Sequence, residues 1–413
     1  MFVGHTRFSL FNPGAGDWKS SSRTSSAEEA AFEKYLFSEE RLAPRAEVFM
    51  QNTVPMLNRA SERHRIRHVV SYSENLPAKY QEMLTEAAEK HPFLVLDRKA
   101  PKEGASPWQS VVGDEIADTE CVGAYRLDDD DLLADDFFDR MAGYIRDPFV
   151  GMWVTFAHGY TAVTSEGRIF RPRKVTWPKI AIGLTAVHKK ESGGKIVGPS
   201  ARGGHNRVDE HNAMIVDSRE PSYLWLRSTN QDSLVNVPEA ERLRKLEGML
   251  HEYELASAVD FRRSFPHLKN VEFGESWELL KGEESAKQPI DFELPKPLNS
   301  FSIKYGFKFS GALDPRNYIM RFGIERDSKP EGKNDRELGL GEAKDLASSV
   351  NGLSFSENPT VGFFKYLPLR RGKGEMRFSL SLPTGYVCTE LQIREWKNPE
   401  NPLKLTYLRV NES

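Results

Sequence analysis

Four consecutive aspartates, Asp128 to Asp131, are the part of this sequence best suited to chemistry. In an extended chain, side chains two positions apart point the same way, so Asp128 and Asp130 would lie on one side of the backbone. Two carboxylates placed in this way can bind one hard divalent cation. Such a cation can hold a diphosphate and neutralise the charge that develops as the phosphate leaves. The run therefore predicts a metal site that binds a diphosphate.

A structural role accounts for only part of this run. Aspartate caps helices and interacts favourably with their positive ends, so we expect Asp131 and Asp135 to cap the helix predicted over 132–145. A cap needs one residue, however, and four adjacent like charges repel one another. Capping therefore does not explain all four aspartates, and the metal site is the preferred interpretation.

The elements that must position the aspartates form an alternating series. Strands are predicted at 2–11, 66–72, 93–96 and 120–127, with helical patterns over 27–57 and 79–91 between the first three. Such alternation is typical of β-α-β units and an open α/β sheet. The strand over 120–127 runs directly into the aspartates, and ligands of open α/β sheets bind at the carboxyl ends of the strands. The location therefore agrees with a binding site.

The remaining chain divides into further segments. A strong helical pattern over 239–258 predicts a helical extension covering 236–272. The stretch 273–297 is highly charged and ends in two prolines, which predicts a linker. Beyond it, six stretches of period-two alternation predict a small antiparallel β-sandwich over 298–413. The α/β domain is then expected to occupy 1–235.

Composition excludes several classes of protein. The 413 residues carry 57 Lys and Arg against 60 Asp and Glu, a net charge of −3 that argues against a nucleic-acid partner. The two cysteines, Cys121 and Cys388, lie far apart, as expected in a reducing cytosol. No apolar stretch approaches the roughly 20 residues of a membrane-spanning helix, and the N-terminus lacks a signal-peptide pattern. A cytoplasmic protein without a transmembrane segment is expected.

Several segments resemble known enzymes. The "RLDDDD" segment between a strand and an apolar stretch resembles the DXD element of GT-A glycosyltransferases. More narrowly, "TRFSLF", "RAEVFMQNTVPML", "HVVSYSENLP", "YRLDDDD" and "GYTAVTSEGRI" resemble the bacterial putative rhamnosyltransferase family over roughly residues 1–235. The resemblance implies a GT-A, Rossmann-like nucleotide-sugar domain. It also implies sugar transfer from a nucleotide-diphosphate donor to a glycan or glycoconjugate acceptor in bacterial surface polysaccharide assembly.

The resemblance also assigns roles to individual residues. Asp128 and Asp130 would bind Mn²⁺ or Mg²⁺ together with the donor diphosphate. The donor itself would be contacted by four further residues, namely Arg126, Asp129, Ser73 and Glu74. The alternatives are a surface position on the strand for Arg126 and a plain turn for Ser73 and Glu74.

A base and a third metal ligand are expected later in the chain. An inverting transferase needs a carboxylate to deprotonate the acceptor hydroxyl, and Asp209 is the first candidate, with Glu210 the second. The alternative is an exposed charged loop. Many GT-A enzymes supply a metal-binding histidine near the end of the domain, where this chain has Ser228 and Thr229. We therefore assign that role to His205.

Two other functions compete with this one. The first is a non-catalytic glycan-binding or scaffold protein with a degenerate transferase domain, which the uncertain base and the missing histidine would suit. The second is a metal-dependent phosphotransferase or nucleotidyltransferase, which can also use clustered aspartates. The latter would be expected to show a phosphate-binding Gly/Lys loop, and none precedes the first helix.

Overall fold

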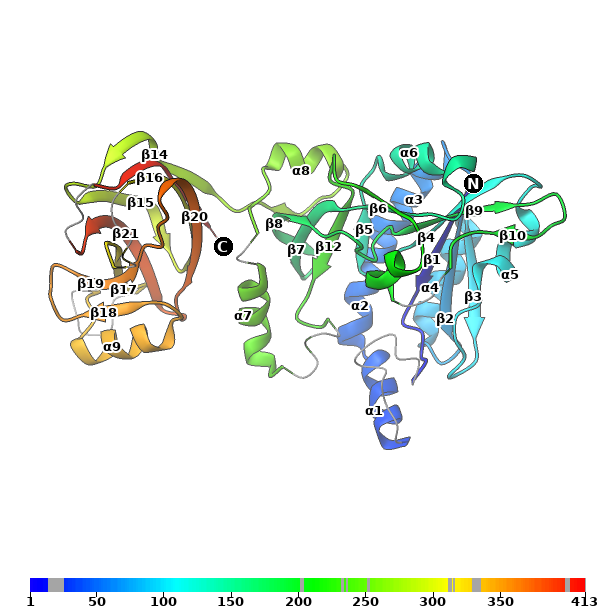
Figure 1. Ribbon diagram of the computed structural model, residues 1–413. Coiled ribbons are helices and arrows are strands. Elements are labelled where there is room, and N and C mark those ends of the chain that lie inside the picture. The colour runs from blue at the N-terminus through cyan, green and yellow to red at the C-terminus, as the bar shows by residue number, and fades with distance from the viewer. Residues whose placement is uncertain are drawn as a thin grey trace. The chain divides into compact units, whose positions relative to one another are not determined.

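A computed structural model describes residues 1–13, 26–200, 204–231, 234, 237–250, 253–310, 314, 316–328, 336–397 and 402–412 (Figure 1). The chain forms two compact units, Met1–Phe273 and Gly274–Ser413. In the described part of the chain, no helix is both long and apolar enough to cross a membrane.

The main sheet of the first unit has the order β11-β6-β9-β4-β1-β2-β3, with β10 beside β9. Its strands are β1 (Phe2–Arg7), β2 (Ile66–Ser73), β3 (Leu94–Lys99), β4 (Cys121–Arg126), β6 (Trp153–Phe156), β9 (Thr185–Lys190), β10 (Ile196–Val197) and β11 (Met214–Asp217). The four strands β1 to β4 are mutually parallel, whereas β9 runs antiparallel to both β4 and β6. This Rossmann-like sheet confirms the predicted fold class, and it brings the carboxyl ends of β1 to β4 to one edge.

Helices connect and cover these strands. They are α1 (Ser26–Leu36), α2 (Glu39–Val48), α3 (Val54–Ser61), α4 (Ala78–Lys90), α5 (Trp108–Val112) and α6 (Phe137–Met141). Between α2 and α3 the helix widens into a π-helical segment at Phe49–Thr53. Apolar side chains of α2 to α4 pack with those of β1, β2 and β4 in the largest core cluster. The 3.6-residue spacing of apolar residues in the sequence therefore marks the faces that are buried.

A second sheet lies within the same unit, in the order β13-β8-β7-β12-β5. Its strands are β5 (Asp131–Leu133), β7 (His158–Ser165), β8 (Arg168–Thr176), β12 (Tyr223–Arg227) and β13 (Val271–Glu272). The prediction of a helix over 132–145 is wrong at its start, because Asp131–Leu133 pairs with β12 and the helix begins only at Phe137. The pairing partner lies about ninety residues later in the chain, so local periodicity does not reveal it. Asp131 accordingly begins a strand and does not cap a helix.

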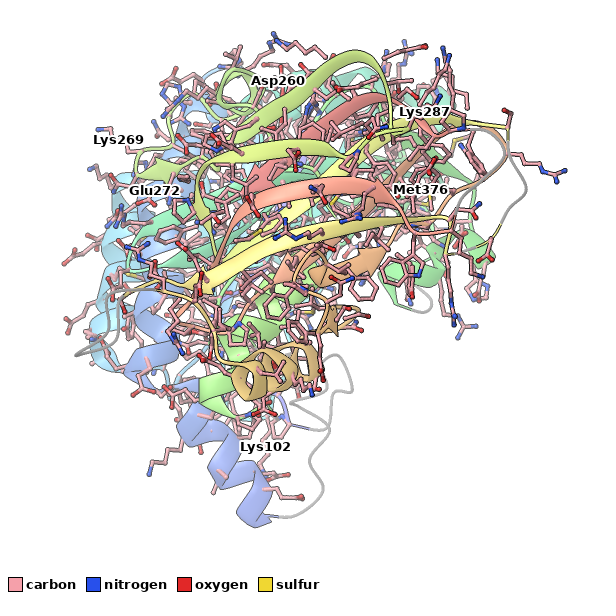
Figure 2. The ribbon with its side chains drawn as sticks, turned by 90° about the vertical axis from the view of Figure 1, so that its left-hand side faces the viewer. Lys102, Asp260, Lys269, Glu272, Lys287 and Met376 are labelled. Carbon is pink, nitrogen blue, oxygen red and sulfur yellow. The ribbon has the colours of Figure 1, made fainter. Side chains whose placement is uncertain are left out.

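Two helices, α7 (Glu239–Leu250) and α8 (Ala258–Ser264), complete the first unit. The helical pattern expected over 236–272 is only partly helical, because α7 ends at Leu250, α8 covers Ala258–Ser264 and β13 lies at Val271–Glu272. Asp260 on α8 and Glu272 on β13 are labelled in Figure 2.

The second unit contains two antiparallel sheets, β14-β22-β16-β20 and β15-β21-β17-β19-β18, with α9 (Leu340–Ser349). The strands are β14 (Ser276–Ser285), β15 (Ile290–Leu298), β16 (Ser300–Phe309), β17 (Tyr318–Arg326), β18 (Ser354–Ser356), β19 (Gly362–Tyr366), β20 (Gly372–Ser381), β21 (Tyr386–Glu395) and β22 (Lys404–Glu412). Side chains from both sheets share one core cluster, as expected for a β-sandwich.

The stretch 273–297 is not the linker that its charge predicted, because β14 and most of β15 lie in it. In β15 the apolar residues Ile290, Phe292 and Leu294 are buried, and the acidic residues Asp291 and Glu293 between them are exposed. The high charge therefore belongs to the outer face of a strand. The sandwich begins near residue 276 and not at 298.

Candidate functional site at the carboxyl edge of the main sheet

The aspartate run alternates between the surface and the interior. The side chains of Asp128 and Asp130 are 19% and 28% exposed, whereas Asp129 and Asp131 are buried at 2% and 5%. Asp128 and Asp130 are thus the more exposed pair in the turn that links β4 to β5, and this turn is closed by a hydrogen bond from the backbone N–H of Asp131 to the carbonyl of Asp128 at 3.4 Å. The other two carboxylates face inward.

Arginines contact the first three aspartates. Arg45, on α2, forms an ion pair with the buried Asp129, and its Nη2 lies 2.9 Å from Oδ2 of Asp130. Arg126, the last residue of β4, donates from Nε and Nη2 to Oδ1 of Asp128 at 3.2 and 3.1 Å. The site therefore combines anionic and cationic groups within one short segment.

Burial and mutual repulsion raise the pKa of two of these carboxyl groups. Burial raises the pKa of Asp130, and Arg45 opposes the shift while Asp129 and Asp128 add to it. Burial and the charges of Asp130 and Asp128 raise the pKa of Asp131 well above its ordinary value. Oδ2 of Asp129 and Oδ1 of Asp131 are buried with no hydrogen-bond partner among the described residues. A cation bound at the run would oppose these shifts, because a nearby positive charge favours the ionised carboxylate.

A polar network follows the neighbouring strand ends. Nε2 of His5 on β1 lies 2.8 Å from Oγ of Ser71 on β2, and that hydroxyl donates to Oδ2 of Asp97 on β3 at 2.7 Å. Ser106 donates to both oxygens of Asp97, from its backbone N–H at 3.0 Å and its hydroxyl at 2.9 Å. Burial alone would raise the pKa of Asp97, but these hydrogen bonds lower it. Asp97 is thus an ionised acceptor on β3, in the same parallel sheet as the strand that leads to the aspartate run.

Asp97 and Ser71 were not among the residues predicted from the sequence. The signal that could have found them is their position, because both lie close to the ends of predicted strands of the same parallel sheet as the strand that leads to the aspartates. In a parallel sheet these ends meet at one edge.

A buried hydrogen-bonded layer supports this edge from within. Nε2 and Nδ1 of His68 lie 2.8 Å from Oγ1 of Thr6 and 2.9 Å from the hydroxyl of Tyr125. The Thr6 hydroxyl donates to the backbone carbonyl of Leu127 at 2.7 Å, directly before the aspartates. Burial lowers the pKa of His68 to about 3 and that of His5 to about 4, so both imidazoles are neutral near pH 7. The layer fixes the course of the chain into the turn.

Aromatic and basic side chains flank the run on its β12 side. Trp225 pairs with Asp131 in the sheet, and the guanidinium of Arg227 lies 3.5 Å from the centre of a Trp225 ring. Trp177, 44% exposed, meets Trp225 edge to face with centroids 5.6 Å apart. Burial lowers the pKa of Arg227, and Asp131 opposes that shift. These residues form a partly open wall suited to sugar rings or phosphates.

The predicted donor contacts at the end of β2 differ in their surroundings. Ser73 is fully buried, and its hydroxyl accepts the backbone N–H of Phe11 at 2.7 Å. Glu74 is exposed, and its backbone N–H donates to the carbonyl of Lys99 at 2.9 Å. A structural role therefore accounts for Ser73, while the Glu74 side chain stands in solvent.

The predicted base and histidine lie in a short 3-10 helix, His205–Glu210. Lys179 lies 3.0 Å from Oδ1 of Asp209 and lowers the pKa of that exposed carboxyl. Arg207 pairs with Glu210 in the same way and lowers its pKa. Nδ1 of His205 lies 2.7 Å from the backbone carbonyl of Lys179. All three side chains therefore make local contacts in this helix and its neighbouring loop.

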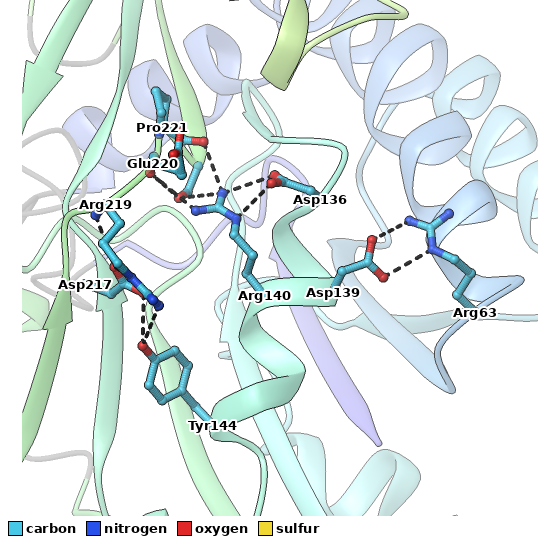
Figure 3. Close-up of polar contacts among 10 residues, drawn as sticks. Arg63, Asp136, Asp139, Arg140, Tyr144, Asp217, Arg219, Glu220 and Pro221 are labelled. Carbon is cyan, nitrogen blue, oxygen red and sulfur yellow. Dashed lines mark hydrogen bonds and ion pairs between the residues drawn. The ribbon is translucent and has the colours of Figure 1, made fainter.

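The acidic residues that follow the run are neutralised separately (Figure 3). Asp136 pairs with Arg140, which also donates to the carbonyl oxygen of Pro221 at 3.1 Å, and Asp139 pairs with Arg63. Nearby, the Tyr144 hydroxyl donates to Asp217 at 2.9 Å. These contacts tie α6 to the chain around β11 and β12. Asp136 and Asp139 are thus paired with arginines outside the aspartate run.

Residues 1–240 match the family described as "putative rhamnosyl transferase". The chain belongs to this family. It is accordingly a glycosyltransferase, and the matched region covers the main sheet and every strand of the second sheet except β13, including the aspartate run. Family membership favours an enzyme over a scaffold protein. No curated protein matches the chain.

Solved structures give only distant similarities. A Staphylococcus aureus TarS fragment in complex with UDP-GlcNAc is 12% identical with a TM-score of 0.27, over 64% of this chain and 71% of that one. A carbohydrate-binding module of Cellvibrio mixtus lichenase 5A is 11% identical with a TM-score of 0.14, over 34% and 87%. An isomalto-dextranase of Arthrobacter globiformis is 12% identical with a TM-score of 0.15, over 30% of this chain and only 15% of that enzyme.

The chemistry of the run fits a cation that keeps other ligands. In the described part of the chain, no three or more His, Cys, Asp or Glu side chains gather in a position to hold a metal ion. His205 is therefore not brought to Asp128 and Asp130 as a third ligand. Mg²⁺, however, is commonly held by one or two carboxylates together with waters and substrate phosphates. Asp128 and Asp130, which are both partly exposed, fit this second arrangement.

Proposed function

We propose that this protein transfers a sugar from a nucleotide-diphosphate donor to a glycan or glycoconjugate acceptor, with Mn²⁺ or Mg²⁺ as cofactor. The observation that carries the proposal is the alternation of the aspartate run at the carboxyl edge of the sheet, in a chain of the rhamnosyl transferase family. A role in bacterial surface polysaccharide assembly in the cytoplasm remains a prediction of the sequence.

In this proposal Asp128 and Asp130 hold the cation. When bound, the cation supplies positive charge to the leaving diphosphate. Arg126 lies beside Asp128 and can turn its guanidinium to a phosphate oxygen, because arginine and phosphate match in geometry. Asp97, with Ser71 behind it, can accept hydrogen bonds from hydroxyl groups of the nucleoside. Trp177 and Trp225 then exclude water and orient the donor.

Asp209 remains the proposed base, with Glu210 as the alternative. A base must be ionised before it accepts a proton, and the ion pair with Lys179 keeps Asp209 ionised near neutral pH. The acceptor would have to displace Lys179 from the carboxylate. We expect Asp209→Asn to leave donor binding unchanged and to reduce transfer at least a hundredfold. Unchanged turnover would exclude Asp209.

Nucleotide-dependent thermal stabilisation tests the donor and metal together. We expect one of UDP, dTDP or GDP to raise the melting temperature with Mn²⁺ present and to raise it less without Mn²⁺. Asp130→Asn should abolish the metal-dependent part. Asp118→Asn, an exposed aspartate before β4, is the matched control and should respond like the wild type. A metal-independent response to every nucleotide would contradict the proposed cofactor.

A further inference from the structure

A cavity lies in the first unit, and none of the four aspartates lines it. Its volume is about 440 Å³, within the range of roughly 300–1,000 Å³ typical of ligand sites. Its walls come from the helical segment Glu47–Arg59, the β7–β8 hairpin, β5 and the segment Ser264–Asn270. The cavity is thus built from parts of the chain that are distant in sequence.

The wall that covers the cavity is anchored at both ends. The backbone N–H of Asp135 donates to the carbonyl of Ser264 at 3.0 Å, and that of Ile169 donates to the carbonyl of Asn270 at 3.0 Å. Between these two bonds the segment contributes Phe265 and Leu268, both buried. Lys269 projects outward from the same segment (Figure 2). The cavity is therefore preformed.

The floor of the cavity is apolar and the rim is polar. Leu132, Leu226 and Phe265 are buried members of one core cluster that also lines the cavity. Around them stand the amide side chains of Gln51 and Asn52, which lie in the π-helical segment. Neither amide makes a side-chain hydrogen bond within the described residues. π-Helical segments are rare and frequently occur at functional sites.

The charges of the rim cancel. Glu47 and Asp135 are balanced by Arg59 and Lys269. Arg59 donates from Nε and Nη2 to the same oxygen of Asp135, Oδ1, at 3.1 and 3.0 Å. Oδ2 of Asp135 thus remains an acceptor next to a guanidinium donor. Such a rim suits paired hydroxyl groups and gives no net attraction to a phosphate or a carboxylate.

We propose that this cavity binds an uncharged saccharide unit. The apolar floor packs against the C–H groups of the ring, while the amides and the Arg59–Asp135 pair exchange hydrogen bonds with its hydroxyl groups. The site is separate from the proposed donor site but follows it directly in the chain, because Leu132 and Leu133 come immediately after the aspartates. Binding here requires neither metal nor nucleotide, so it goes beyond the proposed transfer.

Ligand-observed saturation-transfer NMR on the full chain tests this site, without metal or nucleotide. The probes are L-rhamnose, D-glucose and the neutral trisaccharide maltotriose, with D-glucuronate as the charged comparison. We expect transfer to at least one neutral probe, and at least tenfold weaker binding in Gln51→Leu and in Asn52→Leu. Tighter binding of maltotriose than of glucose would point to a glycan, and the reverse order to a free sugar; either supports a saccharide site.

Gln109→Leu, which alters an exposed glutamine of α5 outside the cavity, is the matched control and should bind like the wild type. Melting temperatures of all variants establish that they fold. Asp130→Asn should also bind the sugar normally, which separates this proposal from that of the donor site. The proposal is overturned if no neutral probe binds, if glucuronate binds equally well, or if both cavity variants bind like the wild type.

Discussion

At the scale of single residues, Arg45 offsets the negative charge of two of the four aspartates. Its guanidinium lies between the buried carboxylate of Asp129 and the half-buried one of Asp130, and only 13% of its side chain is exposed. Removing one partner of a buried ion pair leaves an uncompensated charge, which costs far more than the intact pair contributes. The arginine therefore has a structural as well as an electrostatic role.

We predict that Arg45→Ala lowers the free energy of unfolding by about 3 kcal/mol. Urea denaturation at pH 7 measures the loss. The comparison is Arg63→Ala, because Arg63 also pairs with an aspartate, but both partners are more than 40% exposed. An exposed pair contributes at most about 1 kcal/mol. Equal losses in the two variants would show that burial does not govern the Arg45 contacts.

His68 gives a prediction for pH. Burial lowers the pKa of His68 from the ordinary value of 6.5 to about 3 in the folded chain. The folded state therefore keeps this imidazole neutral. The stability this provides is complete above pH 6.5 and is lost as the pH falls toward the folded pKa. Between pH 6 and 4, His68 thus adds a slope of about 1.4 kcal/mol per pH unit.

We expect His68→Gln to reduce the pH dependence of the free energy of unfolding by this slope. Urea denaturation at half-unit steps from pH 4 to pH 7 supplies the measurement. The slope is the informative quantity, since the substitution also changes the hydrogen bonds to Thr6 and Tyr125. A variant with the wild-type slope would mean that His68 does not remain neutral in the folded protein.

At the scale of elements, the close approach of β1 to its neighbours sets the site geometry. Gly4 lies on β1, where a methyl group would overlap the His68 ring on β2 and the Tyr125 ring on β4. The absence of a side chain at Gly4 therefore gives room for the buried hydrogen-bonded layer. That layer in turn holds the carbonyl of Leu127 and the turn after β4.

Gly4→Ala should lower the free energy of unfolding by about 2 kcal/mol or more, because it overpacks a buried layer. It should also weaken nucleotide-dependent stabilisation at the edge of the sheet. Gly143→Ala is the control, since no heavy atom lies within 4 Å of a methyl group there, and it should change stability by less than about 0.5 kcal/mol. A Gly4→Ala variant as stable as the wild type would be incompatible with this packing.

At the scale of the whole molecule, each of the two units has its own core. Side chains of the second unit pack between its two sheets, and β14 and β15 contribute one strand to each sheet. Such an arrangement allows the unit to fold alone. It also places the start of the unit at Gly274, well before residue 298, where the sequence predicted that the sandwich begins.

The fragment 274–413 is expected to unfold in one cooperative transition followed by circular dichroism. The shorter fragment 298–413 lacks β14 and almost all of β15, so it exposes the edges of both sheets and should show no such transition. If the shorter fragment were equally cooperative, the charged stretch would be a linker after all.

The sequence by itself determined the class of fold and the position of its most informative residues. Alternating apolar patterns specified the strands β1 to β4, and the aspartate run was located at a strand end because both features are local. Exposure alternates along the run with the predicted period of two, and a shared side for Asp128 and Asp130 stays a prediction. Family membership agrees with the resemblance of the same segments.

Only the tertiary structure decided which charges meet. Residues far apart in the chain meet in four places. They form the pairing of β5 with β12, the ion pairs of Arg45, the network of Ser71 with Asp97, and the cavity beside the π-helical segment. The charged residues on the outer face of β15 led to the wrong prediction of a linker for the same reason. A charged residue does not reveal which strand will pair with its own. Local spacing determines the direction in which a side chain points. Its partners depend on contacts between residues far apart in the chain, which no short segment of the sequence reveals.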